Sequence, residues 1–235
     1  MVYGLIIAAG KQSRFGIATP KALMPYGERT LLDINVANME TVCDMVLVVT
    51  SLENYEWFNK YRRIIIESGK GCGDAVLQAL NILDLNDDDT VFIQWGDCLH
   101  TNTIYSELRN KYDHTNKLLI PCVREDSPYV QIVPKKDGTV DVYFSKYGEK
   151  TAEGFHDLSL FYRKAKLLRE YLKDFANKIT VNDKYVHKHN NEMQFLDVFN
   201  ETDLKAEVVE FKNYKTFDFN TVEEFHALME SRILR

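Results

Sequence analysis

The chain has 235 residues, a formal net charge of −6, 45% hydrophobic residues and 27% charged residues. These values are typical of a globular protein and exclude a disordered tail, a collagen-like repeat and a coiled coil. The sequence has neither an apolar run of about 20 residues nor a long basic block, so we expect no membrane span and no nucleic-acid partner. The cysteines stand alone without a secretory signal, which predicts a cytoplasmic protein with reduced thiols.

Short apolar runs and amphipathic stretches alternate through the first half of the chain. Strands are expected at Tyr3–Ala9, Met45–Thr50, Arg63–Glu67, Thr90–Gln94 and Lys117–Val123. Helices are expected at Thr30–Glu40, Asn54–Tyr61, Cys72–Leu83 and Thr101–Lys111. This order predicts a Rossmann-like, three-layer α/β/α fold with a mixed but mostly parallel sheet. Ligands of such sheets bind at the carboxyl ends of the strands.

The second half has shorter and more polar patterns, which predict a small β-rich region. Alternating segments at Tyr129–Val133 and Val140–Ser145 flank an Asp-Gly turn and predict a hairpin. The elements expected after it are a strand at Asp157–Tyr162, a basic helix at Arg163–Phe175, a loop at Lys178–Asn191, and strands at Glu207–Phe211 and Lys215–Phe219. Thr221 and Glu224 form a capping box, which predicts a final helix.

A cationic loop follows the first strand. It reads Ala8-Ala9-Gly10-Lys11-Gln12-Ser13-Arg14-Phe15-Gly16 and is followed by Pro20-Lys21. The backbone N–H groups of a glycine-containing loop form an anion-binding nest, and Arg14 can clamp phosphate oxygens bidentately. Positive groups that converge on phosphates are what phosphoryl or nucleotidyl transfer requires, because negative charge builds up at the transferred phosphorus. The alternative interpretation is a solvated basic turn.

This loop resembles the signature of the NTP-transferase superfamily, which includes nucleoside-diphosphate-sugar pyrophosphorylases and small bacterial cytidylyltransferases. Further stretches resemble the family's other motifs in the expected order: Gly71-Cys72-Gly73-Asp74-Ala75, Trp95-Gly96-Asp97 and Phe217–Glu224. The resemblance implies a nucleotidyltransferase of the EC 2.7.7 class. Such an enzyme joins the NMP of an NTP to a small phosphorylated acceptor and releases pyrophosphate.

The resemblance also implies roles for individual residues. Arg14 and Lys21 would be catalytic and would hold the triphosphate. The implied nucleotide-binding residues are Ala8, Ala9, Gly10, Lys11, Gly71, Cys72, Gly73 and Asp97. Asp97 would bind Mg²⁺, with Asn220 and Asp218 as further metal ligands. We expect one domain over residues 1–235, with a nucleotide-binding half (1–125), an acceptor-binding half (126–220) and a C-terminal helix (221–235).

The acceptor is less well specified by the sequence. Candidate acceptor-binding residues flank the strands of the second half: Tyr129, Gln131, Lys146, His156 and Asp157. The family's sugar-binding pattern is poorly kept at Glu153–Ser159, so the acceptor is either a sugar phosphate or a non-sugar such as phosphoglutamine or phosphocholine. The small size and the weak sugar motifs make the chain resemble the small cytidylyltransferases, and this resemblance implies CTP as the favoured nucleotide. The resemblance implies a role in capsule or cell-envelope biosynthesis.

Several alternatives remain open. They are a UTP-dependent sugar-phosphate uridylyltransferase, a hydrolase and an inactive nucleotide-binding regulatory module, and a homodimer is as open as a monomer. The inactive module is kept open by Cys72, which stands where the family usually has Thr or Ser, and by Asn220. Trp95 either stacks near the nucleotide or packs in the core, and Cys98 is expected to be structural. His187-Lys188-His189 is interpreted as a mobile surface loop rather than a metal site.

Overall fold

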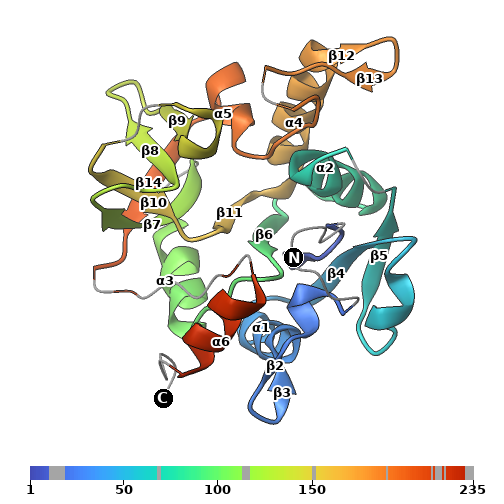
Figure 1. The fold of residues 1–235 in the computed structure, drawn as a ribbon. Helices are drawn as coiled ribbons and strands as arrows, with labels where there is room; N and C mark the ends of the chain where they lie inside the picture. Colours follow the sequence, from blue (N-terminus) through green and yellow to red (C-terminus); the bar gives the residue numbers. More distant parts are fainter. Residues whose placement is uncertain are drawn as a thin grey trace.

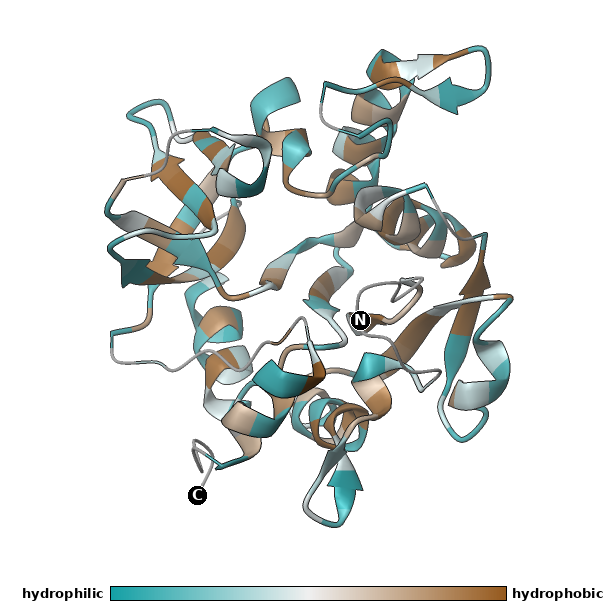
Figure 2. Ribbon diagram, in the orientation of Figure 1, coloured by the Kyte–Doolittle hydropathy of each residue, from teal (hydrophilic) through white to brown (hydrophobic). Residues whose placement is uncertain are grey.

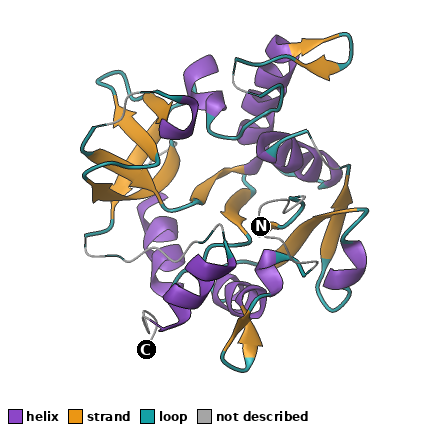
Figure 3. Ribbon diagram, in the orientation of Figure 1, coloured by secondary structure: helices purple, strands orange, loops and turns teal. Residues whose placement is uncertain are grey.

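A computed structural model describes residues 1–10, 19–67, 70–112, 117–149, 152–188, 190–212, 214, 219 and 221–230. Ten strands form one mixed sheet with helices packed on both of its faces (Figures 1 and 3). The predicted α/β/α architecture is therefore confirmed.

Four parallel strands form the first half of the sheet. They are β1 (Val2–Ile7), β4 (Met45–Ser51), β5 (Arg63–Ile66) and β6 (Thr90–Trp95), and they lie in the order β5-β4-β1-β6. Each begins or ends within two residues of its predicted bounds. The chain moves outward from β1 to β5 and then returns to the other side of β1 with β6. The carboxyl ends of β1 and β6 therefore form a switch point, where sheets of this kind bind their ligands.

Helices cover both faces of these strands. The first face carries α2 (Cys72–Ile82) and α4 (Ala165–Ile179), and the second carries α1 (Leu31–Glu40) and α3 (Asn102–Tyr112). Leu5 of β1 packs in the first core and Ile6 in the second, because neighbouring side chains of a strand point to opposite faces. Burial on both faces explains why β1, β4 and β6 are predominantly apolar, whereas the edge strand β5 exposes Ile65. Figure 2 shows the apolar segments in brown.

Antiparallel pairing dominates the second half of the sheet. Its strands are β7 (Leu118–Glu125), β8 (Val130–Pro134), β9 (Val140–Phe144), β10 (Gly154–Asp157), β11 (Leu160–Lys164) and β14 (Ala206–Glu210). Strand β11 lies antiparallel between β6 and β7, and the order continues through β10 and β8 to the edge strand β9. The predicted β8–β9 hairpin is confirmed. Strand β14 adds a parallel partner to β7.

The prediction of one strand at Asp157–Tyr162 is wrong, because two strands, β10 and β11, share this stretch. Ser159 between them has a φ of 57°, a left-handed conformation that no strand residue adopts. The Asp157 carboxylate accepts the Ser159 N–H at 2.8 Å and stabilises this turn. The turn sends β10 and β11 to different parts of the sheet.

Two further segments differ from the sequence prediction. The helix expected at Asn54–Tyr61 is only the 3₁₀ turn η2 (Tyr55–Phe58). The loop expected at Lys178–Asn191 contains a small hairpin of β12 (Thr180–Val181) and β13 (Lys184–Tyr185). Helix α4 continues to Ile179, four residues beyond its predicted end. These polar segments lack a clear period, and tertiary contacts decide their conformation.

The remaining elements are short. They are η1 (Lys21–Leu23), β2 (Pro25–Tyr26), β3 (Arg29–Thr30), η3 (Ser145–Tyr147), α5 (Asp197–Glu201) and α6 (Val222–Glu230). The capping box of α6 is confirmed, because the Glu224 N–H donates to Thr221 Oγ1 at 3.2 Å. The strand expected at Lys215–Phe219 lies largely outside the described residues. Among the described helices, none has the length and apolar character that crossing a bilayer requires.

Candidate active site

A lysine and an aspartate meet at the carboxyl ends of β1 and β6. Pro20 fixes the backbone before η1, and Lys21 Nζ lies 3.6 Å from Asp97 Oδ2 in the turn after β6. The Lys21 ammonium also donates to the carbonyl oxygen of Phe219 at 3.0 Å. The Lys21 side chain is 11% exposed and that of Asp97 is 35% exposed. The site therefore combines a fixed positive charge with a carboxylate that solvent and ligands can reach.

Gly96 brings the ends of β1 and β6 close together. Its N–H donates to the Ile7 carbonyl oxygen at 2.9 Å, and a Cβ at this position would lie 3.1 Å from that oxygen. Ala8, Ala9 and Gly10 follow β1 at the same edge of the sheet as Asp97. A Cβ built on Gly10 would meet none of the described atoms within 4 Å, so the described part of the protein leaves room at this backbone position.

Four of the predicted site residues lie outside the described residues. Lys11 and Arg14 belong to the segment 11–18, and Asp218 and Asn220 to the last predicted motif. Their roles stay predictions. Two other predicted residues, Lys21 and Asp97, are brought together although 76 positions separate them.

The Gly71-Cys72-Gly73 corner, which joins β5 to α2, packs against the protein's own backbone. Gly71 has a φ of 102°, and a Cβ there would lie 2.4 Å from the carbonyl oxygen of Met193. The Gly73 N–H donates to the same oxygen at 2.8 Å. Both glycines are therefore required for this close approach.

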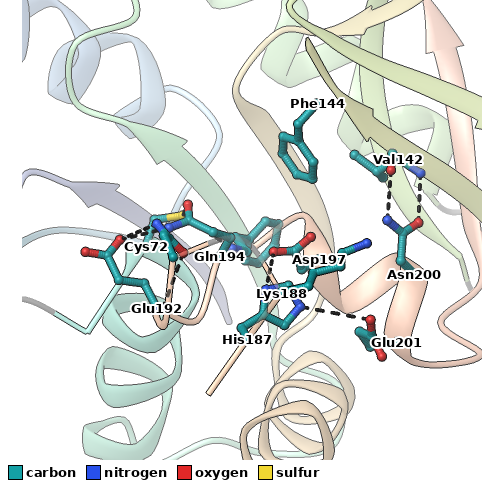
Figure 4. A network of polar contacts seen from close by, with 12 residues as sticks. Cys72, Val142, Phe144, His187, Lys188, Glu192, Gln194, Asp197, Asn200 and Glu201 are labelled. Carbon is teal, nitrogen blue, oxygen red and sulfur yellow. Dashed lines mark hydrogen bonds and ion pairs between the residues drawn. The ribbon is translucent and has the colours of Figure 1, made fainter. Parts of the chain in front are cut away.

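Sequence reasoning missed the segment that covers this corner. The Phe195 N–H donates to Cys72 Sγ at 3.3 Å, and the Cys72 thiol donates to Gln194 Oε1 at 3.5 Å (Figure 4). Burial raises the pKa of the Cys72 thiol, so this group stays protonated and serves as a hydrogen-bonding group rather than a nucleophile. The two glycines signalled that something approaches closely, but the sequence did not indicate which segment.

Two neighbouring residues have packing roles. The Trp95 ring lies 5.8 Å from that of Phe161 and 5.6 Å from that of Phe195, measured between centroids. Cys98 is buried, and its carbonyl oxygen accepts from the Asn35 side chain at 2.7 Å. Trp95 thus contributes to the core beneath the site, and the structural interpretation of Cys98 is confirmed.

Three of the predicted acceptor residues make internal contacts. Asp157 is buried and supports the turn at Ser159, and burial raises the pKa of its carboxyl group. The Gln131 side chain accepts from the Ala152 N–H at 3.2 Å. His156 Nδ1 lies 2.9 Å from Glu125 Oε2. These side chains hold the antiparallel strands together.

The other two acceptor candidates are more accessible. Tyr129 is 47% exposed. Lys146 Nζ lies 4.6 Å from the centroid of the Tyr147 ring, and its positive charge partly offsets the effect of burial on the pKa of Cys72. Lys146 is an exposed, positively charged candidate.

A buried polar cluster lies beyond the corner, between α4, α5 and β9 (Figure 4). The prediction that His187 belongs to a mobile surface loop is wrong, because its side chain is 4% exposed and its Nδ1 lies 3.4 Å from Asp197 Oδ2. Burial raises the pKa of Asp197 to about 7 and lowers that of His187. Asn200 donates to the Val142 carbonyl oxygen and accepts the Val142 N–H, both at 2.8 Å, so α5 is fixed to the edge strand β9.

The described part of the site could supply one carboxylate ligand, that of Asp97, to a hard cation such as Mg²⁺. Asp97 offers an accessible carboxylate at a strand end, and Mg²⁺ takes few protein oxygens and keeps water and phosphate ligands for the rest. No group of three or more His, Cys, Asp or Glu side chains that could hold a metal occurs among the described residues. A metal would therefore depend on Asp97 together with substrate oxygens.

The family model of the MobA-like NTP transferase domain matches residues 4–175. This range runs from within β1 to within α4 and includes Lys21, the Gly71-Cys72-Gly73 corner and Asp97.

Individual relatives and solved structures are more distant. The bifunctional protein GlmU of Buchnera aphidicola is 26% identical over 74% of this chain and 40% of its own length. The chain spans between a third and two fifths of the curated relatives it matches. A Bacillus anthracis protein assigned as a glucose-1-phosphate thymidylyltransferase has a TM-score of 0.76 at 12% identity, covering 100% of this chain and 96% of that chain. The CTP:phosphocholine cytidylyltransferase of Streptococcus pneumoniae has a TM-score of 0.69 at 13% identity, covering 98% of each chain.

Proposed function

Since the chain belongs to the MobA-like NTP transferase domain family and is a nucleotidyltransferase, we propose that it joins the NMP of CTP to a small phosphorylated acceptor and releases pyrophosphate. We further propose that residues 1–125 bind the nucleotide and residues 126–220 the acceptor. The observation that carries the proposal is the Lys21–Asp97 pair, 3.6 Å apart at the switch point of the sheet.

The proposed reaction is a single in-line displacement. A phosphate oxygen of the acceptor forms a bond to the α-phosphorus of the NTP, and the bond from that phosphorus to the bridging oxygen breaks. Pyrophosphate leaves with the electron pair, so no covalent enzyme intermediate is needed. The Lys21 ammonium neutralises the negative charge that develops on the phosphoryl oxygens, and its burial makes this stronger than in water. Arg14 is proposed to clamp the triphosphate from the loop after β1.

Mg²⁺ is the proposed cofactor, with Asp97 as its protein ligand and Asp218 and Asn220 as further candidates. When bound, the ion neutralises phosphate charge and orients the triphosphate. Asp97 also forms an ion pair with Lys21, so this carboxylate would both orient the Lys21 ammonium and bind Mg²⁺.

CTP is favoured over the other nucleotides because a phosphocholine cytidylyltransferase shares the fold over nearly the whole chain. The second candidate is a UTP-dependent sugar-phosphate uridylyltransferase, since a protein assigned as a glucose-1-phosphate thymidylyltransferase also shares the fold. Tyr129 and Lys146 are the acceptor-half residues that we propose as direct contacts, and Gln131, His156 and Asp157 are proposed to support the strands that carry them. Of these two, Lys146 carries the positive charge that suits a phosphorylated acceptor.

The test is a matrix of CTP, UTP, GTP, ATP and dTTP against phosphocholine, a phosphorylated amino acid and glucose 1-phosphate, with Mg²⁺ and a pyrophosphate-release readout. We expect one pyrimidine nucleotide with one acceptor to give turnover well above the background without acceptor. NTP consumption that does not depend on the acceptor would indicate a hydrolase instead.

Nucleotide binding is measured separately by thermal shift. A nucleotide at about 100 times its Kd stabilises the fold by about 2.7 kcal/mol, which corresponds to roughly 5–10 °C for a chain of this length. A thermal shift without turnover for any acceptor would favour the inactive regulatory module. Neither a shift nor turnover with any nucleotide would contradict the proposal.

A further inference from the structure

Three side chains behind the Gly71-Cys72-Gly73 corner form a hydrogen-bonded relay. The Tyr185 hydroxyl donates to Asp74 Oδ1 at 2.5 Å, and Gln78 Nε2 donates to Asp74 Oδ2 at 2.5 Å. Gln78 also closes a double hydrogen bond with the backbone of Glu67. It donates from Nε2 to the Glu67 carbonyl oxygen at 3.1 Å and accepts the Glu67 N–H at Oε1 at 3.0 Å.

The Gln78 side-chain amide forms hydrogen bonds to the Glu67 backbone of the kind that a neighbouring strand would form. Strand β5 is the outermost strand of its side of the sheet, so no further strand pairs with the backbone where β5 ends at Ile66. A primary amide has one acceptor and two donor hydrogens, and the described contacts of Gln78 use all of these functions. The amide therefore fixes the chain at Glu67, immediately before it enters the connection to Gly71.

Asp74 holds the Gln78 amide in this orientation. Its residue is 5% exposed, and its two carboxylate oxygens are divided between Gln78 and Tyr185. It lies in the first turn of α2, where the helix dipole favours a negative charge. Tyr185 comes from β13, 111 residues further along the chain, so the relay depends on a contact between distant segments.

The same distant part of the chain also holds the other end of the connection. The Met193 N–H donates to the Lys70 carbonyl oxygen at 2.9 Å, and the Met193 carbonyl oxygen accepts the Gly73 N–H at 2.8 Å. The chain between β5 and α2 is therefore fixed before the corner by Gln78 and at the corner by Met193. None of the relay side chains lies on the corner itself, so they act on it through the backbone.

We propose that Tyr185, Asp74 and Gln78 are positioning residues that set the corner against the nucleotide base and thereby determine which base the enzyme accepts. This inference rests on the proposed function and on the nucleotide-binding role that the family resemblance implies for Gly71, Cys72 and Gly73. Discrimination between pyrimidines depends on hydrogen-bonding groups held within a fraction of an ångström, since a displaced donor or acceptor leaves a polar group of the base unpaired. The relay restrains the position of the corner through the backbone, and its side chains do not need to contact the base.

The decisive variant is Gln78→Glu, which preserves the shape of the side chain. A carboxylate can still accept the Glu67 N–H, but it cannot donate to the Glu67 carbonyl oxygen, and it repels the Asp74 carboxylate. Asn81→Asp is the matched control, because it adds the same charge at an exposed position of the same helix. Tyr185→Phe removes only the outer hydroxyl of the relay, and Tyr143→Phe on β9 is its control. The tyrosine pair keeps the test valid if Gln78→Glu does not fold.

Two readouts are combined. In hydrogen exchange, we expect amides of residues 67–73 to exchange at least tenfold faster in Gln78→Glu, with those of β1 and β7 unchanged. In steady-state kinetics, we expect KM for the NTP to rise about tenfold and the CTP-to-UTP ratio of kcat/KM to fall at least fivefold. The values of kcat and of KM for the acceptor should stay within twofold of wild type. Tyr185→Phe should give smaller changes in the same directions, and both controls should match wild type.

Unchanged exchange at residues 67–73 in both relay variants would overturn the inference, whatever the activity. Equal loss for all bases, or an equal rise in KM for the acceptor, would also overturn it, because that pattern indicates general damage to the fold. If the wild-type protein transfers no nucleotide, the proposed function fails on its own. The inference is then decided by exchange and by the CTP-against-UTP difference in thermal shift, and it is overturned if the relay variants leave either of them unchanged.

Discussion

The two halves of the sheet carry their polar groups in different ways. In the parallel half, Gly10 and the partly exposed Asp97 lie just beyond the ends of β1 and β6, and Lys21 pairs with Asp97 there. In the antiparallel half, the Gln131 and Asp157 side chains form hydrogen bonds within the protein. Parallel strands direct their carboxyl ends to one edge, so residues after each strand converge there. Antiparallel strands offer no such common edge.

This difference indicates where the functional residues of each half of the sheet are expected to lie. In the first half, a motif that follows a strand is already near the site. In the second half, the groups that contact the Gly71-Cys72-Gly73 corner come from a connection, the segment 193–195. Connections are where binding residues are commonly placed on a rigid sheet.

The largest expected effect is that of Lys21→Ala. If the buried Lys21 ammonium neutralises phosphate charge as we propose, its removal should lower kcat about 10³-fold, as the loss of a major electrostatic contact in the transition state does. Pyrophosphate release measures the effect, and circular dichroism checks the fold. Lys60→Ala is the control, because Lys60 pairs with Asp33 away from the site and is 58% exposed. Wild-type turnover in Lys21→Ala would contradict the proposed catalytic role of Lys21.

The next effect is that of Asp97→Asn. The amide keeps the shape but loses the charge that would hold Mg²⁺ and pair with Lys21, so we expect kcat/KM to fall about 10²-fold. The Mg²⁺ concentration for half-maximal rate should rise in parallel. Asp84→Asn, at an exposed position, should change neither quantity. An unchanged Mg²⁺ titration in Asp97→Asn would exclude this carboxylate as a metal ligand.

The third effect concerns stability at the junction of the two halves. A Cβ at Gly73 would lie 2.9 Å from the Met193 carbonyl oxygen, so Gly73→Ala must displace the 193–195 segment. We expect a loss of about 2 kcal/mol in the free energy of unfolding, measured by urea denaturation. Gly10→Ala, which meets open space, should stay within about 0.5 kcal/mol of wild type. Equal stability of the two variants would mean that the segment does not hold the corner.

The smallest effect is that of Asp197→Asn in the buried cluster. Burial raises the pKa of this carboxyl from 3.8 to about 7. The folded state therefore binds the proton more tightly than the unfolded state, and stability falls as the pH rises from about 4 to 7. The variant removes this loss, which is at most about 4 kcal/mol, but it also weakens the contact with His187.

We therefore expect Asp197→Asn to be about 1–2 kcal/mol more stable than wild type at pH 8, with the difference disappearing below pH 4. Urea denaturation at a series of pH values measures it. A difference that does not change with pH would show that Asp197 does not titrate in this range.

Much of the fold could be predicted because its signals are local. The continuous apolar strands β1, β4 and β6, and the capping boxes at Thr30 and Thr221, depend on residues a few positions apart. The split between β10 and β11 could not, because the turn at Ser159 depends on one side-chain hydrogen bond inside an apolar run.

For the candidate site, the sequence by itself determined which residues follow the parallel strands: the Ala8-Ala9-Gly10 stretch, Lys21, the corner at Gly71 and Asp97. It could do so because strand order and period place these residues without knowledge of distant contacts. Only the tertiary structure decided that Met193 closes on Gly71, that Tyr185 reaches Asp74 and that His187 is buried beside Asp197. These contacts join segments more than a hundred residues apart, or polar residues without a period. Their positions are set by packing, which no local pattern encodes.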